Sequence, residues 1–204
     1  MLLRRLRPPR ESSLRTPRIN GAYCESRDVL ESGLLRLLSF NIQQGNDTTR
    51  YRRYVTRSWQ PFLPYANREK KLQLIGDMLT CFDLVALQEV DGGSLRSKGV
   101  NQVERLATLG SFPFWHQQLN RNMGRFAQHS NGLLSRLCPT RIEDHPLPGR
   151  RGRGAMLLRF GEGKDALVVV MVHLALGKRS RDRQLSYIRE LISDYRYQIL
   201  MGDM

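Results

Sequence analysis

The sequence predicts an α/β or α+β fold arranged as a sandwich, and three observations support this fold class. Short apolar segments of strand length alternate with amphipathic segments of helix length. The predicted strands outnumber the predicted helices, and helices separate only some of them, which favours a sandwich over a simple doubly wound sheet. The chain has 204 residues, of which 40% are hydrophobic, and this is enough for one domain with a sizeable core.

The beginning of the chain lacks any periodic pattern. Residues 1–33 are polar and rich in Arg and Ser, so we predict a disordered basic extension followed by a domain over residues 34–204. Residues 34–42 (LLRLLSFNI) form the first predicted strand. Residues 43–66 contain a glycine and two prolines, and we predict a long loop there.

Two helices and a buried strand follow this loop. Asn67 is expected to be the N-cap of a helix whose apolar residues recur at helical spacing. These apolar residues are Leu72, Ile75, Met78 and Leu79. Residues 83–90 (DLVALQEV) form a second buried strand, and residues 101–109 form a short helix.

The second half is predicted to be rich in strands. These strands are expected at residues 112–117, 131–135, 154–160, 166–173 and 197–201. Residues 138–152 contain three prolines and form a loop or an edge, and residues 161–164 (GEGK) indicate a hairpin turn. An Arg-rich amphipathic helix is expected at 177–194. Its inward residues are expected to be Leu185, Ile188, Leu191 and Ile192.

The composition limits the classes of partner and of site. The net charge of +14 and the pI of about 10.5 suit an anionic partner, although a merely basic soluble protein is an equal alternative. Residues 1–20 alone hold six Arg and one Glu. Cys24, Cys81 and Cys138 form no CxxC pair, which argues against a disulfide scaffold or a zinc site and favours a reducing, cytoplasmic location. No apolar run has the length of a membrane-spanning helix.

Four polar residues stand at or just beyond the ends of apolar strands: Asn41, Glu89, His173 and Asp203. Strand ends are rigid, and open α/β folds place their sites there. Carboxylate and amide oxygens are the ligands that Mg²⁺ prefers, and Mg²⁺ takes only one or two protein carboxylates. Each residue also has a structural alternative. Asn41 and Asp203 could be turn residues, and His173 could be a hydrogen-bonded structural histidine.

Five segments together resemble a known family. LSFNIQ (38–43), LQEV (87–90), SNGLLSR (130–136), VHLALG (172–177) and ILMGD (199–203) occur in the order found in the endonuclease/exonuclease/phosphatase superfamily. The resemblance covers about residues 34–204. It implies a four-layer α/β/β/α sandwich with two face-to-face sheets, and a Mg²⁺-dependent phosphoester hydrolase in which water attacks phosphorus. Mn²⁺ is an alternative cofactor.

The resemblance also implies residue roles. Glu89 would be a Mg²⁺ ligand, with Asn41 near both the metal and the scissile phosphate. Asp203 resembles the Asp of the family's Gly-Asp-x-Asn motif, which orients the nucleophile. His173 resembles a histidine that many members place against the scissile phosphate. Asn131 is assigned to structural support.

The chain departs from the family pattern at its end. Met204, the last residue, occupies the x position of the Gly-Asp-x-Asn motif, and the Asn that would come next is not in the sequence. The family's later Asp and Asp-His pair are not in the sequence either. We therefore expect a truncated domain whose second sheet is incomplete, with an unpaired edge and an exposed apolar face. The alternative function is an inactive domain that binds nucleic acid or anionic lipid. The substrate, a nucleic acid, phospholipid or small phosphoester, stays open.

Overall fold

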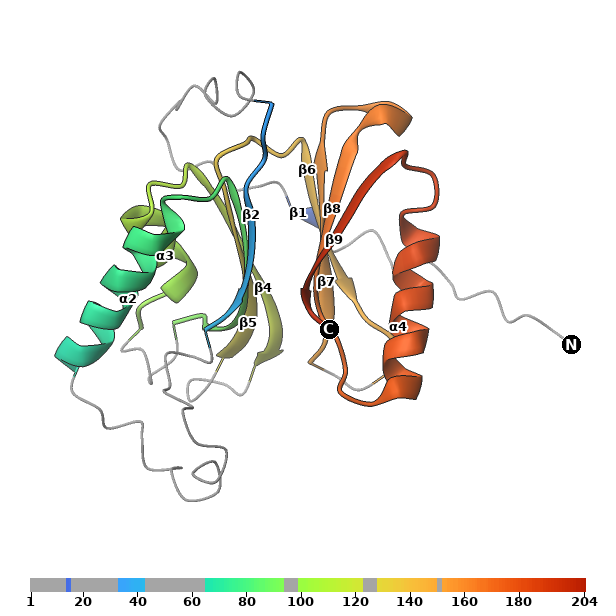
Figure 1. The fold of residues 1–204 in the computed structure, drawn as a ribbon. Helices are drawn as coiled ribbons and strands as arrows, with labels where there is room; N and C mark the ends of the chain where they lie inside the picture. Colours follow the sequence, from blue (N-terminus) through green and yellow to red (C-terminus); the bar gives the residue numbers. More distant parts are fainter. Residues whose placement is uncertain (1–13, 16–32, 43–64, 94–98, 123–127, 150–151) are drawn as a thin grey trace, which may run out of the picture.

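A computed structural model describes residues 14–15, 33–42, 65–93, 99–122, 128–149 and 152–204. Two β-sheets lie face to face, and helices cover their outer faces (Figure 1). This arrangement confirms the predicted four-layer sandwich. The predicted loop at 43–66 lies outside the described residues, apart from its last two positions. The predicted extension also lies outside them, apart from residues 14–15 and 33.

The first sheet has the strand order β2-β3-β5-β4. Its strands are β2 (Leu37–Asn41), β3 (Leu84–Asp91), β5 (Gln128–Ser135) and β4 (Phe114–Asn122). β2 and β3 are parallel, and the other two pairs are antiparallel. Helices α2 (Tyr65–Leu79) and α3 (Gln102–Leu109) cover the outer face of this sheet (Figure 1).

The second sheet has the strand order β1-β6-β7-β8-β9. Its strands are β1 (Leu14–Arg15), β6 (Arg141–Pro146), β7 (Gly154–Phe160), β8 (Leu167–His173) and β9 (Tyr197–Asp203). β8 and β9 are parallel, whereas the other pairs are antiparallel. Helix α4 (Lys178–Leu191) covers the outer face, and a 3-10 turn, η6 (Gly163–Asp165), lies in the β7–β8 hairpin.

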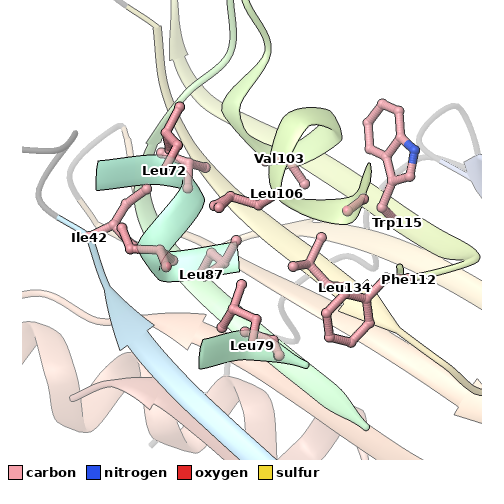
Figure 2. Close-up of a cluster of buried hydrophobic side chains, with 13 residues drawn as sticks. Ile42, Leu72, Leu79, Leu87, Val103, Leu106, Phe112, Trp115 and Leu134 are labelled. Atoms are coloured by element: carbon pink, nitrogen blue, oxygen red, sulfur yellow. The ribbon is translucent and has the colours of Figure 1, made fainter. Parts of the chain in front are cut away.

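The alternation of side chains along each strand divides the core into layers. On β3, Val85 and Leu87 pack towards α2 and α3, in the cluster that Figure 2 shows. Leu84 and Ala86 on the same strand face the second sheet instead, in a separate cluster with residues such as Met156. A third cluster lies between the second sheet and α4. This period of two is what a strand buried on both faces requires.

Arg136 holds the helix layer against the first sheet. It follows β5, and its guanidinium donates to the carbonyl oxygens of Thr80, Phe82, Gly110 and Ser111 at 3.0–3.1 Å. These carbonyls belong to the segments that follow α2 and α3. The helices therefore have their carboxyl ends satisfied by a side chain of the sheet they cover.

Three local predictions were wrong. Asn67 is not an N-cap, because α2 already begins at Tyr65. Leu185 is exposed rather than inward. Ile188 and Ile192 are buried and Leu191 packs against the same cluster, as predicted, and Gln184 takes the buried position next to Leu185. Residues 138–152, predicted as a loop or an edge, contain the strand β6.

β9 lies at an end of the strand order of the second sheet, with β8 as its neighbour among the described strands, which agrees with the expected unpaired edge. Met201 is nevertheless buried, and Ile199 packs against the layer between the sheets. Among the described residues, no helix is long and apolar enough to span a membrane.

Candidate active site between the two sheets

Asp203 connects two of the predicted site residues across the facing sheets. Asn41 ends β2 in the first sheet, whereas His173 and Asp203 end β8 and β9 in the second. The Asn41 Nδ2 donates a hydrogen bond to the Asp203 Oδ2 at 3.0 Å. The His173 Nε2 lies 3.6 Å from the same Asp203 oxygen. The structure therefore brings together the three residues that the sequence assigned to catalysis.

Gly202 allows β9 to remain paired with β8 up to this site. The parallel register continues to its last pair, His173 with Asp203, and the Leu174 N–H donates to the Asp203 carbonyl at 2.8 Å. Gly202 has a φ of 141°, and a Cβ added there would lie 2.0 Å from the Val172 carbonyl oxygen. Only glycine fits this conformation and this close approach. A glycine directly before Asp203 is thus a steric requirement.

Glu89 occupies a β-bulge near the end of β3. Leu87 pairs with Gly132 and Val90 pairs with Ser130. Two residues of β3, Gln88 and Glu89, therefore stand opposite the single residue Asn131 of β5. Without the extra residue, alternation would turn position 89 towards the helix layer that holds Leu87. The bulge returns Val90 to that layer and leaves Glu89 on the side of the sheet that carries the site.

The backbone of Glu89 is strained, and its neighbours hold it in place. Its φ is 56°, which is uncommon for any residue except glycine. On one side the Gln88 carbonyl accepts from the Ile42 N–H at 3.1 Å. On the other side the Val90 carbonyl accepts from the Ser130 hydroxyl at 2.9 Å. Strain of this kind persists where surrounding contacts determine it, and it concentrates at functional sites.

Four amide side chains form a row across the first sheet. Register pairs place Asn41 beside Gln88 and Asn131 beside Gln118, and Asn131 stands opposite the bulge that contains Gln88. Asn131 Nδ2 lies 3.4 Å from Gln118 Oε1, and Gln118 Nε2 donates to the Ala155 carbonyl of the second sheet at 2.8 Å. We call these four residues the amide row. At the site, two members of the row bond across to the second sheet, Asn41 to Asp203 and Gln118 to Ala155.

Gln88 and Gln118 lie beside the predicted site residues, and neither was predicted to belong to the site. Both are buried, and Gln88 directly precedes Glu89. Alternation from the buried Ala86 could have placed Gln88 between the sheets. It could not have placed Glu89 beside it, because the bulge reverses the alternation at that point. Gln118 lies in a part of β4 that was not predicted to be strand.

The donor set has limited capacity for a metal. Among the described residues, no group of three or more His, Cys, Asp and Glu side chains gathers to hold one. Mg²⁺ does not need such a group, since it takes one or two carboxylates and keeps several waters. Glu89 supplies a carboxylate, and the buried Asn131 Oδ1 has no hydrogen-bond partner in the structure. An orphaned oxygen opposite a carboxylate fits a hydrated Mg²⁺ held beside them.

A fixed loop borders the site after His173. The Ala175 N–H donates to the Gln184 Oε1 at 2.9 Å, and the Gln184 Nε2 donates to the Pro148 carbonyl at 3.2 Å. Arg181 donates to the Leu176 carbonyl. Leu176 itself is 89% exposed. The buried Gln184 thus fixes the loop that follows β8 to the loop that follows β6.

Comparison with known proteins identifies the family of this chain. Residues 38–204 match the family model described as Endonuclease/Exonuclease/phosphatase family. The chain belongs to this family. Members of the endonuclease/exonuclease/phosphatase family are phosphoester hydrolases, and they are generally Mg²⁺-dependent. No curated protein matches the chain.

Solved structures show the same fold at low sequence identity. A humanized TDP2 from D. rerio carrying 14 mutations has a TM-score of 0.53 and 16% identity; the match covers 83% of this chain and 65% of that one. A conserved protein of unknown function from Enterococcus faecalis V583 has a TM-score of 0.56 and 17% identity, with the same two shares. A β-hairpin deletion mutant of beta toxin from Staphylococcus aureus has a TM-score of 0.52 and 13% identity, covering 83% and 66%. The chain thus spans slightly less than two thirds of the first two structures.

Proposed function

We propose that this chain carries the site of a Mg²⁺-dependent phosphoester hydrolase that uses water as the nucleophile. One observation carries the proposal. Asn41, His173 and Asp203 come from three strands of two facing sheets, and they meet through a single carboxylate oxygen. Asn41 and Asp203 are 162 positions apart in the chain, so the fold and not the local sequence brings them together. The family, a group of phosphoester hydrolases, supplies the reaction class.

Each side chain has a separate role in this proposal. Asp203 holds the Asn41 amide with its Nδ2 turned towards β9, so the two sheets are fixed relative to each other where the phosphate would bind. The His173 Nε2 lies 3.6 Å from the Asp203 carboxylate, at the end of β8. From this position an N–H of the ring would donate to a phosphoryl oxygen and stabilise the charge that develops there.

Glu89 would hold the cation, with Asn41 near it. When bound, Mg²⁺ supplies Lewis-acid polarisation of a phosphoryl oxygen and lowers the pKa of a bound water. In this proposal the bulge would turn the Glu89 carboxylate towards the side of the sheet that carries Asn41 and Asn131.

Replacing the Glu89 carboxylate tests the proposal directly. We expect Glu89→Gln to lose most Mg²⁺-dependent turnover of bis-p-nitrophenyl phosphate, plasmid DNA and sphingomyelin, by about 10²-fold or more, while the chain stays folded. Glu104→Gln is the matched control, because Glu104 is an exposed carboxylate at the start of α3. Turnover that is equal in both variants would remove Glu89 from the site.

A non-enzymatic alternative rests on the charge of the molecule. The net charge is +14, and the first turns of α4 carry Lys178, Arg179 and Arg183, all exposed. Such a surface could hold nucleic acid or anionic lipid without hydrolysis. If plasmid DNA binds in a salt-sensitive way and no phosphoester is hydrolysed with Mg²⁺ or Mn²⁺, this alternative replaces the hydrolase.

A further inference from the structure

We propose that Asn131 is a positioning residue of the site, whose Oδ1 accepts a hydrogen bond from a water in the coordination shell of the cation beside Glu89. This inference rests on the proposed function and deepens it. The sequence motif alone assigned Asn131 to structural support. In the structure, however, the Oδ1 of its amide makes no hydrogen bond with the protein.

The first observation is the burial of Asn131. The residue is 3% exposed, and its Oδ1 is a buried oxygen with no hydrogen-bond partner in the structure. Buried polar groups in proteins are nearly always satisfied, so an exception calls for an explanation. A missing donor, such as a water bound at the site, is one such explanation.

The second observation fixes which end of the amide is unpaired. The Ala155 backbone carbonyl can only accept, so the Gln118 group that faces it at 2.8 Å must be its Nε2. The Oε1 of Gln118 then faces Asn131 and requires a donor, which is the Asn131 Nδ2 at 3.4 Å. A flipped Asn131 would set two carbonyl oxygens against each other. The unpaired atom is therefore an acceptor.

The third observation is the place of Asn131 in the sheet. It stands opposite the bulge that contains Gln88 and Glu89. Its neighbour Gly132 lets α3 approach closely, since a Cβ added there would lie 2.7 Å from a methyl group of Val103. Asn131 is thus held in position by the helix on one side and by Gln118 on the other. The register therefore places Asn131 opposite the strand position whose carboxylate we assign to the cation.

The chemistry of the acceptor selects its ligand. A neutral carbonyl oxygen does not attract a phosphate, whose oxygens are also acceptors. It does suit a water polarised by Mg²⁺ or Mn²⁺, because metal-bound waters are strong donors and Mg²⁺ retains several of them. Removing a group that hydrogen-bonds to a metal's ligands, without touching the metal itself, typically lowers metal affinity by about 10–100-fold.

The test measures Mn²⁺ binding to the full chain by electron paramagnetic resonance of the free ion, without any substrate. Asn131→Leu and Asn131→Val remove the acceptor, and we expect the affinity for Mn²⁺ to fall about 10-fold. Asn131→Asp keeps an oxygen in place and should bind Mn²⁺ at least as tightly as the unmodified chain. Gln73→Leu is the control on α2, because the exposed Gln73 amide bonds with Asp77 away from the amide row and from the Glu89 bulge. Its affinity should be unchanged.

Urea unfolding of the same variants separates positioning from structural support. Structural support predicts that Asn131→Leu and Asn131→Val lose stability and keep the affinity for Mn²⁺, and that result would overturn the inference. If both variants bind Mn²⁺ normally while Glu89→Gln does not, the inference fails and the proposed function stands. If the unmodified chain binds Mn²⁺ no better than Glu89→Gln, the proposed function fails with it.

Discussion

Each sheet contains a unit of a strand, a helix and a parallel strand, and the two units differ in how their second strand places an acidic side chain. In one, β2 is followed by α2 and the parallel strand β3; in the other, β8 is followed by α4 and the parallel strand β9. Each unit must place an acidic side chain between the sheets at the end of its second strand. In the first unit β3 contains an extra residue that forms a bulge, and in the second unit β9 contains a glycine directly before the acidic residue.

The difference shows how backbone geometry positions a catalytic group. In β3 the extra residue changes the alternation, so Glu89 lies in a conformation with φ of 56°. In β9 the register continues unbroken to Asp203, and Gly202 takes the unusual conformation instead. In the first unit the functional residue itself carries the strain. In the second its neighbour does, so Asp203 need not be strained.

The largest effect is expected at Gly202. Gly202→Ala places a Cβ 2.0 Å from the Val172 carbonyl oxygen in a conformation that L-residues rarely adopt, so the end of β9 must leave β8. We expect a loss of about 3–5 kcal/mol in the free energy of unfolding, measured with urea. Gly163→Ala is the control, since Gly163 has a φ of 68° with no atom close to the added Cβ. An equal loss in both variants would show that conformation alone, and not the contact with Val172, matters.

A smaller effect of opposite sign is expected at Glu89. Glu89→Gly relieves the strained φ and should raise the free energy of unfolding by about 1 kcal/mol, while abolishing Mg²⁺-dependent turnover. Ser111→Gly is the matched control, because Ser111 has a φ of 55° and lies outside the site. It should gain similar stability and keep full activity. A Glu89→Gly variant that is less stable than the unmodified chain would show that Glu89 contributes contacts that outweigh its strain.

The smallest effect concerns how each helix layer is attached. Arg136 anchors the segments after α2 and α3 through hydrogen bonds from its guanidinium. On the other side His145 of β6 contacts the Tyr187 hydroxyl of α4 at 3.3 Å and Glu143 at 3.2 Å. Burial lowers the pKa of His145, against the opposing effects of Glu143 and Asp144. The unfolded chain therefore takes up the proton first as the pH falls.

This sign gives a measurable pH dependence. The contribution of neutral His145 to stability is complete above about pH 6.5, the ordinary pKa of histidine, and is lost as the pH falls below it. His145→Gln should show a shallower loss of unfolding free energy between pH 7 and pH 5 than the unmodified chain. Parallel curves would mean that proton binding to His145 is the same in the folded and unfolded states.

The sequence predicted the architecture better than the details of the site. Apolar runs such as residues 83–90 and 166–173 were predicted as buried strands because their composition leaves few other structures. Asn41, His173 and Asp203 were placed correctly at strand ends. The bulge at Glu89 could not be predicted, because an extra residue in a strand depends on the partner strand and leaves no local pattern. Gln184 was missed for a similar reason, since its burial depends on two loops, those of Pro148 and Ala175.

The amide row has a consequence for how water enters the molecule. Over most of their length the two sheets contact each other through side chains such as Leu84, Met156 and Met171. At one end they contact each other through Asn41, Gln118 and their partners instead. Hydrating amides costs little compared with hydrating methyl groups. The sandwich should therefore open to solvent from this end first, and backbone amides beside the row should exchange with deuterium before those at the centre of the same strands.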